Sequence, residues 1–190
     1  MKKIIVFICL IGINFFPQQS KASFLIDPYV GYKLAWDTAT LESGGLSADF
    51  DITRNGVMYG ARAGYQFLGL MAGVEYGMGT GLTSDLAAGS IGGFNVPGAE
   101  SSYDASYMGV FVGYELPIML RAWATYFFDA NWEAEDGSKT ELTAISLGVG
   151  FTGLPFVSLN AEYRLNTFDS GDNYETNGEV FFSASIPLNL

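Results

Sequence analysis

The ionisable side chains of this sequence limit the chemistry that it can perform. The 190 residues contain no histidine, and the single cysteine is Cys9 near the N-terminus. Ser-His-Asp triads, Cys-His pairs and histidine-ligated metal sites are therefore excluded. Carboxylates remain as candidate acid–base groups, above all Glu75, Glu115 and Glu162. Because each can neutralise a nearby cation instead, we interpret them as ion-pair partners and expect neither enzyme activity nor a cofactor.

The elements that position these carboxylates have the pattern of strands. From Phe156 to Thr167, apolar residues alternate with polar ones, and the polar face includes Glu162 and Arg164. A period of two is typical of a β-strand, because successive side chains point to opposite sides of the pleat. The same alternation predicts eight strands, at residues 26–36, 57–67, 70–78, 103–116, 120–128, 141–152, 156–167 and 178–190.

The connections between these strands alternate in length. Short turns are expected at residues 68–69, 117–119 and 153–155, and long polar loops at 37–55, 79–102, 129–140 and 168–177. Together with charged inward faces, this predicts an all-β fold: an eight-stranded antiparallel up-and-down transmembrane β-barrel, with short turns and both termini on the periplasmic side of the outer membrane. A soluble barrel of lipocalin type is the alternative, but long apolar stripes are an aggregation hazard outside a bilayer.

Aromatic residues support the membrane interpretation. On the outward faces they would form a girdle near each end of the barrel, where amphipathic rings meet the membrane interface. The members of the two girdles would be Trp36, Tyr59, Tyr76, Tyr126 and Phe128 on the exterior side, and Tyr65, Phe67, Tyr114 and Phe151 on the periplasmic side.

Seven charged residues are expected to form a network inside the barrel. An eight-stranded barrel is just wide enough to be filled by side chains, so inward charges should pair. Counting outward from the turns sets Arg62 opposite Glu75 and Glu115 opposite Arg121, and we predict both pairs. The full network is Lys33, Arg62, Glu75, Glu115, Arg121, Glu162 and Arg164.

Inward positions are also rich in glycine, which leaves space for large neighbours or for a passage. We expect a plugged interior in which rings fill this space, while a narrow water path or a pocket for an apolar ligand is the alternative. The candidate rings are Tyr29, Phe111, Trp123, Phe127, Phe156 and Phe181.

The loop at residues 129–140 is strongly acidic, but it does not match a calcium-binding loop. That motif requires Gly at its sixth position and Glu at its twelfth, where this chain has Ala134 and Thr140. We therefore interpret the loop as solvated charge and predict no metal site, with weak divalent bridging to anionic lipopolysaccharide as a secondary possibility.

The N-terminal segment has the features of a secretory signal peptide. Lys2 and Lys3 precede an apolar run at residues 4–16, and Ser20-Lys21-Ala22 forms a small-x-small cleavage site. We expect residues 1–22 to be the signal peptide and residues 23–190 to be a single barrel domain. Cleavage would remove three of the nine basic residues and none of the twenty acidic ones, leaving a net charge of about −14. Nucleic acid is therefore not an expected partner.

The complete pattern resembles the small outer-membrane barrels of Gram-negative bacteria, in particular the OmpA membrane domain and OmpX-like proteins. The last strand resembles the assembly signal that the barrel-insertion machinery reads, although it ends in Leu190 where such proteins usually end in Phe. The resemblance implies outer-membrane lipid, lipopolysaccharide and the barrel-assembly machinery as partners.

Three functions are compatible with this resemblance, because a fold does not select one, and an envelope enzyme that uses carboxylates alone is the least favoured of them. The first is a non-enzymatic barrel that supports envelope integrity and presents acidic surface loops for adhesion or for interaction with an extracellular ligand. The alternative is a narrow channel or carrier for a small or apolar solute, as in OmpW-like proteins.

Overall fold

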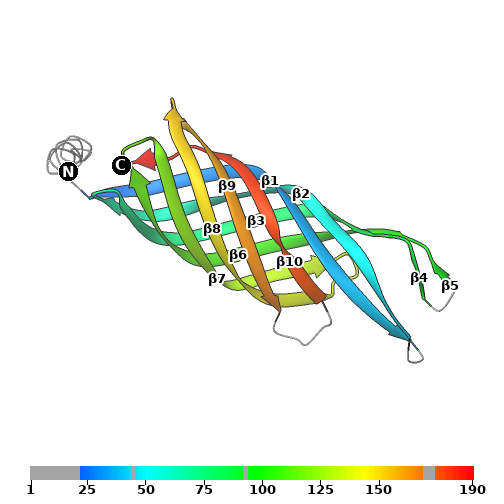
Figure 1. The fold of residues 1–190 in the computed structure, drawn as a ribbon. Coiled ribbons are helices and arrows are strands. Elements are labelled where there is room, and N and C mark those ends of the chain that lie inside the picture. The colour runs from blue at the N-terminus through cyan, green and yellow to red at the C-terminus, as the bar shows by residue number, and fades with distance from the viewer. Residues whose placement is uncertain (1–21, 44–45, 92–93, 169–173) are drawn as a thin grey trace, which may run out of the picture.

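The protein folds into one closed β-barrel (Figure 1). The computed structural model describes residues 22–43, 46–91, 94–168 and 174–190, so the predicted signal peptide lies outside the described residues apart from Ala22. No helix in these ranges is long and apolar enough to span a membrane. The strands are β1 (Ser23–Ser43), β2 (Leu46–Phe67), β3 (Leu70–Leu86), β4 (Gly89–Ile91), β5 (Phe94–Val96), β6 (Ala99–Leu116), β7 (Leu120–Ala134), β8 (Lys139–Leu154), β9 (Val157–Phe168), β10 (Tyr174–Ser185) and β11 (Leu188–Asn189).

Eight antiparallel strands form the wall, as the sequence predicts. Each wall strand pairs with its neighbour in the chain, β4 and β5 form a separate hairpin between β3 and β6, and β10 pairs with β1 to close the ring. After Pro187, β11 continues along β1, where Asn189 lies opposite Leu25. Closure leaves no free edge strand around the wall.

Three tight turns define one end of the barrel, which we call the turn end. Leu68 and Gly69 both have positive φ, as the two-residue hairpin turn of type I′ requires, and Phe67 pairs with Leu70 as predicted. The second turn lies at residues 117–119, also as predicted. The third is centred on Pro155 and Phe156, not on residues 153–155. Strand β9 therefore begins one residue later than expected, at Val157.

The opposite end, which we call the loop end, carries much longer strands than the sequence predicts. Strand β1 continues to Ser43 and pairs with β2 over its whole length, and β3 continues to Leu86. The predicted strands end where their apolar face ends, whereas in the structure the polar segments beyond it continue to pair with their neighbours. Figure 1 shows these strands projecting beyond the rest of the barrel, on the side away from the two termini.

The two faces of the wall differ in polarity. All nine aromatic residues of the predicted girdles are exposed on the outside, together with aliphatic side chains such as Leu147. The inside holds the buried charges and a buried aromatic cluster. A lipocalin-type barrel would have an apolar lumen. The closed ring with an apolar exterior and a polar interior is the architecture of a transmembrane β-barrel.

Candidate functional site

The structure brings six of the seven predicted network residues together inside the barrel. Every one of the six is at most 3% exposed, so their charges are shielded from water and must be neutralised by one another. These residues are Lys33, Arg62, Glu75, Arg121, Glu162 and Arg164. The seventh, Glu115, is half-buried at the turn end.

Arg62 is the centre of this arrangement, because three carboxylates converge on its guanidinium. Its Nη1 lies 3.1 Å from Asp27 Oδ2, its Nε lies 3.3 Å from Glu75 Oε2, and its Nη2 contacts Glu162 Oε1. The guanidinium also stacks on Trp123, with 4.3 Å between Cζ and the ring centroid. The predicted pairing of Arg62 with Glu75 is confirmed in both register and contact.

Arg121 has a different partner from the predicted one. It lies opposite Glu115 in the strand register, as expected, but its Nη2 is 2.8 Å from Asp27 Oδ2 and also donates to Asn160 and Ser185. Glu115 accepts a hydrogen bond from Gln66 instead. The predicted Glu115–Arg121 ion pair is therefore wrong. Asp27 is fully buried and needs a counter-ion, whereas the half-exposed Glu115 can be hydrated.

A second group of charges continues toward the loop end. Arg164 Nη1 lies 2.9 Å from Glu179 Oε1, and its Nη2 is 3.8 Å from Glu162 Oε2. Lys33 Nζ lies 2.8 Å from the other Glu179 oxygen and donates to Tyr107 Oη at 3.0 Å. Glu162 thus links the two groups. We define the interior charge network as four cations, Lys33, Arg62, Arg121 and Arg164, and four carboxylates, Asp27, Glu75, Glu162 and Glu179.

Sequence reasoning missed two members of this network, Asp27 and Glu179. The signal that could have found them is the same alternation of faces. Asp27 shares its face of β1 with Lys33, and Glu179 shares its face of β10 with Phe181. With these two carboxylates, the buried charges balance, which is the condition for burying so many of them.

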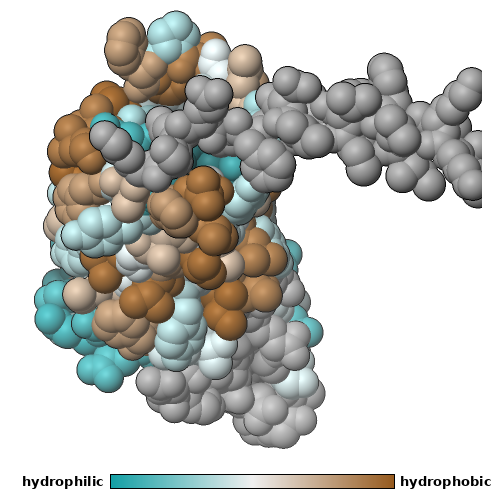
Figure 2. All heavy atoms as spheres, turned by 90° about the vertical axis from the view of Figure 1, so that its left-hand side faces the viewer, coloured by the Kyte–Doolittle hydropathy of each residue, from teal (hydrophilic) through white to brown (hydrophobic). Residues whose placement is uncertain are grey.

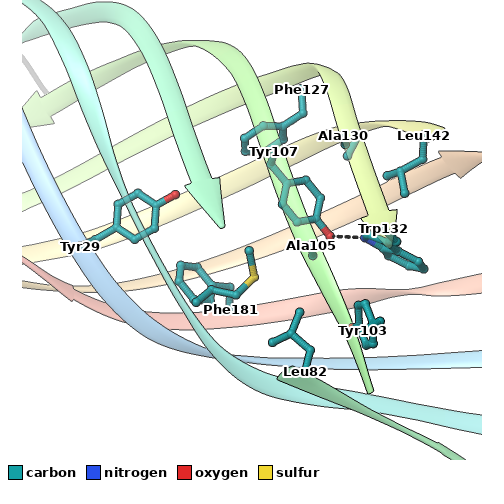
Figure 3. Close-up of a cluster of buried hydrophobic side chains, with 12 residues drawn as sticks. Tyr29, Leu82, Tyr103, Ala105, Tyr107, Phe127, Ala130, Trp132, Leu142 and Phe181 are labelled. Atoms are coloured by element: carbon teal, nitrogen blue, oxygen red, sulfur yellow. Dashed lines mark hydrogen bonds between the residues drawn. The ribbon is translucent and has the colours of Figure 1, made fainter. Parts of the chain in front are cut away.

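A cluster of rings covers the network toward the loop end (Figure 3). Trp132 Nε1 donates to Tyr107 Oη at 2.8 Å, shown as the dashed line. The Trp132 ring contacts two cations, with Lys33 Nζ 4.9 Å and Arg54 Cζ 4.7 Å from its centroid. Arg54 also pairs with Asp37. Trp132, Arg54 and Asp37 lie in segments that the sequence predicts as loops, so their inward position was not anticipated.

Several of the interior glycines make room for rings, as predicted, while others lie against strand backbone or polar side chains. A Cβ at Gly60 or Gly77 would lie 2.6 Å from Tyr29 Oη, and one at Gly148 would overlap the ring of Trp123. Five of the six predicted rings are buried. The exception is Phe156, which is 88% exposed because it lies in the third turn rather than in β9.

The acidic segment between β7 and β8 is held by local contacts. Asp136 Oδ1 accepts the backbone N–H of Ser138 at 2.9 Å, and hydrogen bonds from the side chain and the backbone of Ser138 hold the pKa of this exposed carboxyl below its usual range. Glu133 pairs with Lys139 at 3.1 Å. Within the described ranges, no group of three or more Asp or Glu side chains is placed to hold a metal ion.

Fold and interior together define a class: the protein is a small transmembrane β-barrel of the outer-membrane type whose lumen is occupied by its own side chains. No protein-family model matches the chain, and neither does any curated protein. Solved structures with similar folds include Neisserial surface protein A, with 17% identity over 87% of this chain and 98% of that one, at a TM-score of 0.42.

Two other outer-membrane proteins show comparable similarity. Ail, the attachment invasion locus protein of Yersinia pestis, solved with the heparin analogue sucrose octasulfate, has 12% identity over 87% of this chain and 99% of that one, at a TM-score of 0.49. The outer-membrane protease OmpT of Escherichia coli has 13% identity over 88% and 97%, at a TM-score of 0.36. The barrel architecture follows from the strand pairing, independently of these similarities.

Proposed function

We propose that the protein is a non-enzymatic outer-membrane barrel that acts as a sealed scaffold and presents an acidic surface outside the cell. In this proposal residues 1–22 are removed as a signal peptide, the barrel-assembly machinery inserts residues 23–190, and the turn end with both termini faces the periplasm. The loop end then faces outward, next to lipopolysaccharide.

The filled interior is the observation that carries the proposal. The charge network crosses the lumen from Arg121 to Lys33, and the ring cluster around Trp132 continues it toward the loop end. Any solute would have to separate these pairs, and leaving a buried charge without its partner costs about 3–5 kcal/mol. Several of the interior glycines, which motivated the alternative of a narrow channel or carrier, are packed against rings, as Gly60 and Gly77 are against Tyr29.

The surface that such a scaffold would present is acidic. Exposed carboxylates gather on the long strands and connections of the loop end, with Lys139 as a basic residue among them. A partner with clustered cationic groups fits this surface, and divalent cations could bridge it to lipopolysaccharide phosphates. The carboxylates are Asp49, Asp51, Asp85, Glu100, Asp104, Asp129, Glu133, Glu135, Asp136 and Glu141.

Binding of a fluorescent oligolysine peptide to the protein in phosphatidylcholine vesicles tests this surface. We expect salt-sensitive binding that falls severalfold when Glu133, Glu135 and Glu141 are replaced by Gln, because attraction between exposed charges is screened by salt. The matched control replaces three exposed apolar residues of the lipid-facing side, which should leave binding unchanged. Equal binding by the wild type and the Gln variant would refute the acidic loop end as the interaction surface.

A further inference from the structure

The turns at the turn end carry exposed apolar side chains at their tips. Leu68 lies in the first turn, Ile118 and Met119 in the second, and Phe156 in the third, and all of them are exposed. Hairpin turns favour Asn, Asp and Gly, which tolerate positive φ and are readily hydrated. The side chains at these tips are therefore unusual for turns that would project into water.

The backbone at the same positions is strained. Leu68, Met119 and Phe156 have φ values of 49°, 62° and 65°, and they are the non-glycine residues with positive φ within the described ranges. Bulky L-residues avoid this region, and strain of this kind concentrates where a side chain has a function. One apolar side chain is thus retained at a strained position in each turn.

Charge is missing from the same turns. Residues 67–70, 116–120 and 151–157 include no charged residue, whereas the connection between β7 and β8 at the loop end contains Glu135 and Asp136. Charged side chains are costly near hydrocarbon and favourable in water. The two ends of the barrel are therefore suited to different surroundings.

Exposed apolar residues also flank the turn tips and connect them to the outer face of the wall. Leu70, Leu120 and Leu154 flank the three turns, and each of them is exposed. Figure 2 views the molecule from this end and shows hydrophobic residues over much of the face that the grey atoms leave uncovered. The medium that covers the apolar turns is therefore expected to be the same one that covers the wall, which is lipid.

We propose that the three turns lie in the membrane interface, with Leu68, Ile118, Met119 and Phe156 inserted among phospholipids as an anchor, while the mouth of the barrel, where the half-buried Glu115 lies, stays open to the periplasm. This rests on the proposed placement of the barrel in a bilayer. The anchor fixes the depth of the barrel, because sinking deeper would bring the charged loop end toward hydrocarbon and rising would expose the apolar tips to water.

Site-directed spin labelling tests the anchor. Cys9 is the only cysteine, so in a Cys9→Ser background each introduced cysteine carries the single nitroxide. Labels at Phe156→Cys and Ile118→Cys in phosphatidylcholine vesicles should collide more often with oxygen than with a water-soluble nickel chelate. The reference Leu147→Cys, on the outer wall, should show the same preference, and the control Asp136→Cys the opposite one.

The Leu147→Cys reference separates failure of the anchor from failure of the membrane placement. If Leu147→Cys reports lipid while both turn labels report water, the barrel is inserted and the anchor is refuted, and the tips would then be free to contact a periplasmic protein. If Leu147→Cys also reports water, the membrane placement itself fails.

A substitution at Leu68 provides a second test. Leu68→Asn creates the Asn-Gly sequence that suits a type I′ turn, so relief of strain alone should stabilise the protein. With an anchor, the variant should instead unfold at lower urea concentration in phosphatidylcholine vesicles while gaining stability in detergent micelles, which offer no defined bilayer depth. Stabilisation in both environments would overturn the anchor.

Discussion

The interior and the loop end contain the same kinds of charged residue in opposite surroundings. Inside, four cations and four carboxylates are buried and balanced, and Arg62 alone contacts three carboxylates. At the loop end, carboxylates are exposed and outnumber cations, and pairs such as Lys139–Glu133 lie in water. The difference shows that the role of a charged residue in this barrel depends on its burial and not on its residue type. In the proposed function, the buried interior charges are structural and the exposed loop-end charges form the interaction surface.

Removing the central cation should have the largest effect. Arg62→Ala leaves Asp27, Glu75 and Glu162 without their shared partner, and breaking a buried ion pair costs about 3–5 kcal/mol. Urea unfolding of the protein in vesicles measures the loss. If Arg62→Ala does not fold, Arg62→Lys serves in its place, because it keeps the charge but loses the simultaneous contacts. Unchanged stability in both variants would show that the network does not hold the barrel together.

Filling space beside an interior ring should have an intermediate effect. A Cβ at Gly77 would lie 2.6 Å from Tyr29 Oη, while the ring carbon Cζ is 3.7 Å away. Gly77→Ala should therefore cost about 1–3 kcal/mol of unfolding free energy, and Tyr29→Phe, which removes the hydroxyl, should restore most of it. Absence of this rescue would contradict the close packing.

A glycine of the loop end is the matched control for that experiment. Gly137 has a φ of 81°, and a Cβ there would meet no atom within 4 Å. Because Asn tolerates positive φ, Gly137→Asn should change stability by less than about 0.5 kcal/mol. A loss of unfolding free energy as large as that of Gly77→Ala would contradict the difference between the packed interior and the open loop end.

The exposed ion pair at the loop end should also have little effect on stability. Lys139 and Glu133 have side chains that are 61% and 48% exposed. Solvent screening reduces such pairs to about 0–1 kcal/mol, so Lys139→Ala should leave the urea midpoint almost unchanged. Because the substitution removes a positive charge, it should also strengthen oligolysine binding. A change in stability comparable with that of Arg62→Ala would show that the exposed loop-end charges also hold the barrel together.

The fold could be predicted to a large extent from sequence, because a barrel wall is encoded locally. A period of two assigns each residue to a face, and the two turns at residues 68–69 and 117–119 fix the register of their hairpins. These signals placed Arg62 opposite Glu75 correctly. They failed at the third turn, where Pro155 and Phe156 occupy the tip and Phe156 consequently faces outward.

Contacts across the lumen could not be predicted in this way. Arg121 of β7 reaches Asp27 of β1, and Arg62 of β2 reaches Glu162 of β9, although neither pair lies on adjacent strands. Such contacts depend on the stagger of the closed barrel, which no single hairpin determines. Trp132 was missed for another reason, because the pairing of β7 extends past its apolar face into a polar segment.

Single-channel recording in a planar bilayer tests the sealed interior most directly. We expect that the wild-type barrel, inserted in phosphatidylcholine and bathed in concentrated KCl, shows no steady conductance, because the charge network and the ring cluster around Trp132 occupy the lumen. Steady conductance of the wild type that changes in Arg62→Ala would contradict this account, since ions would then pass through the network that we describe as a seal.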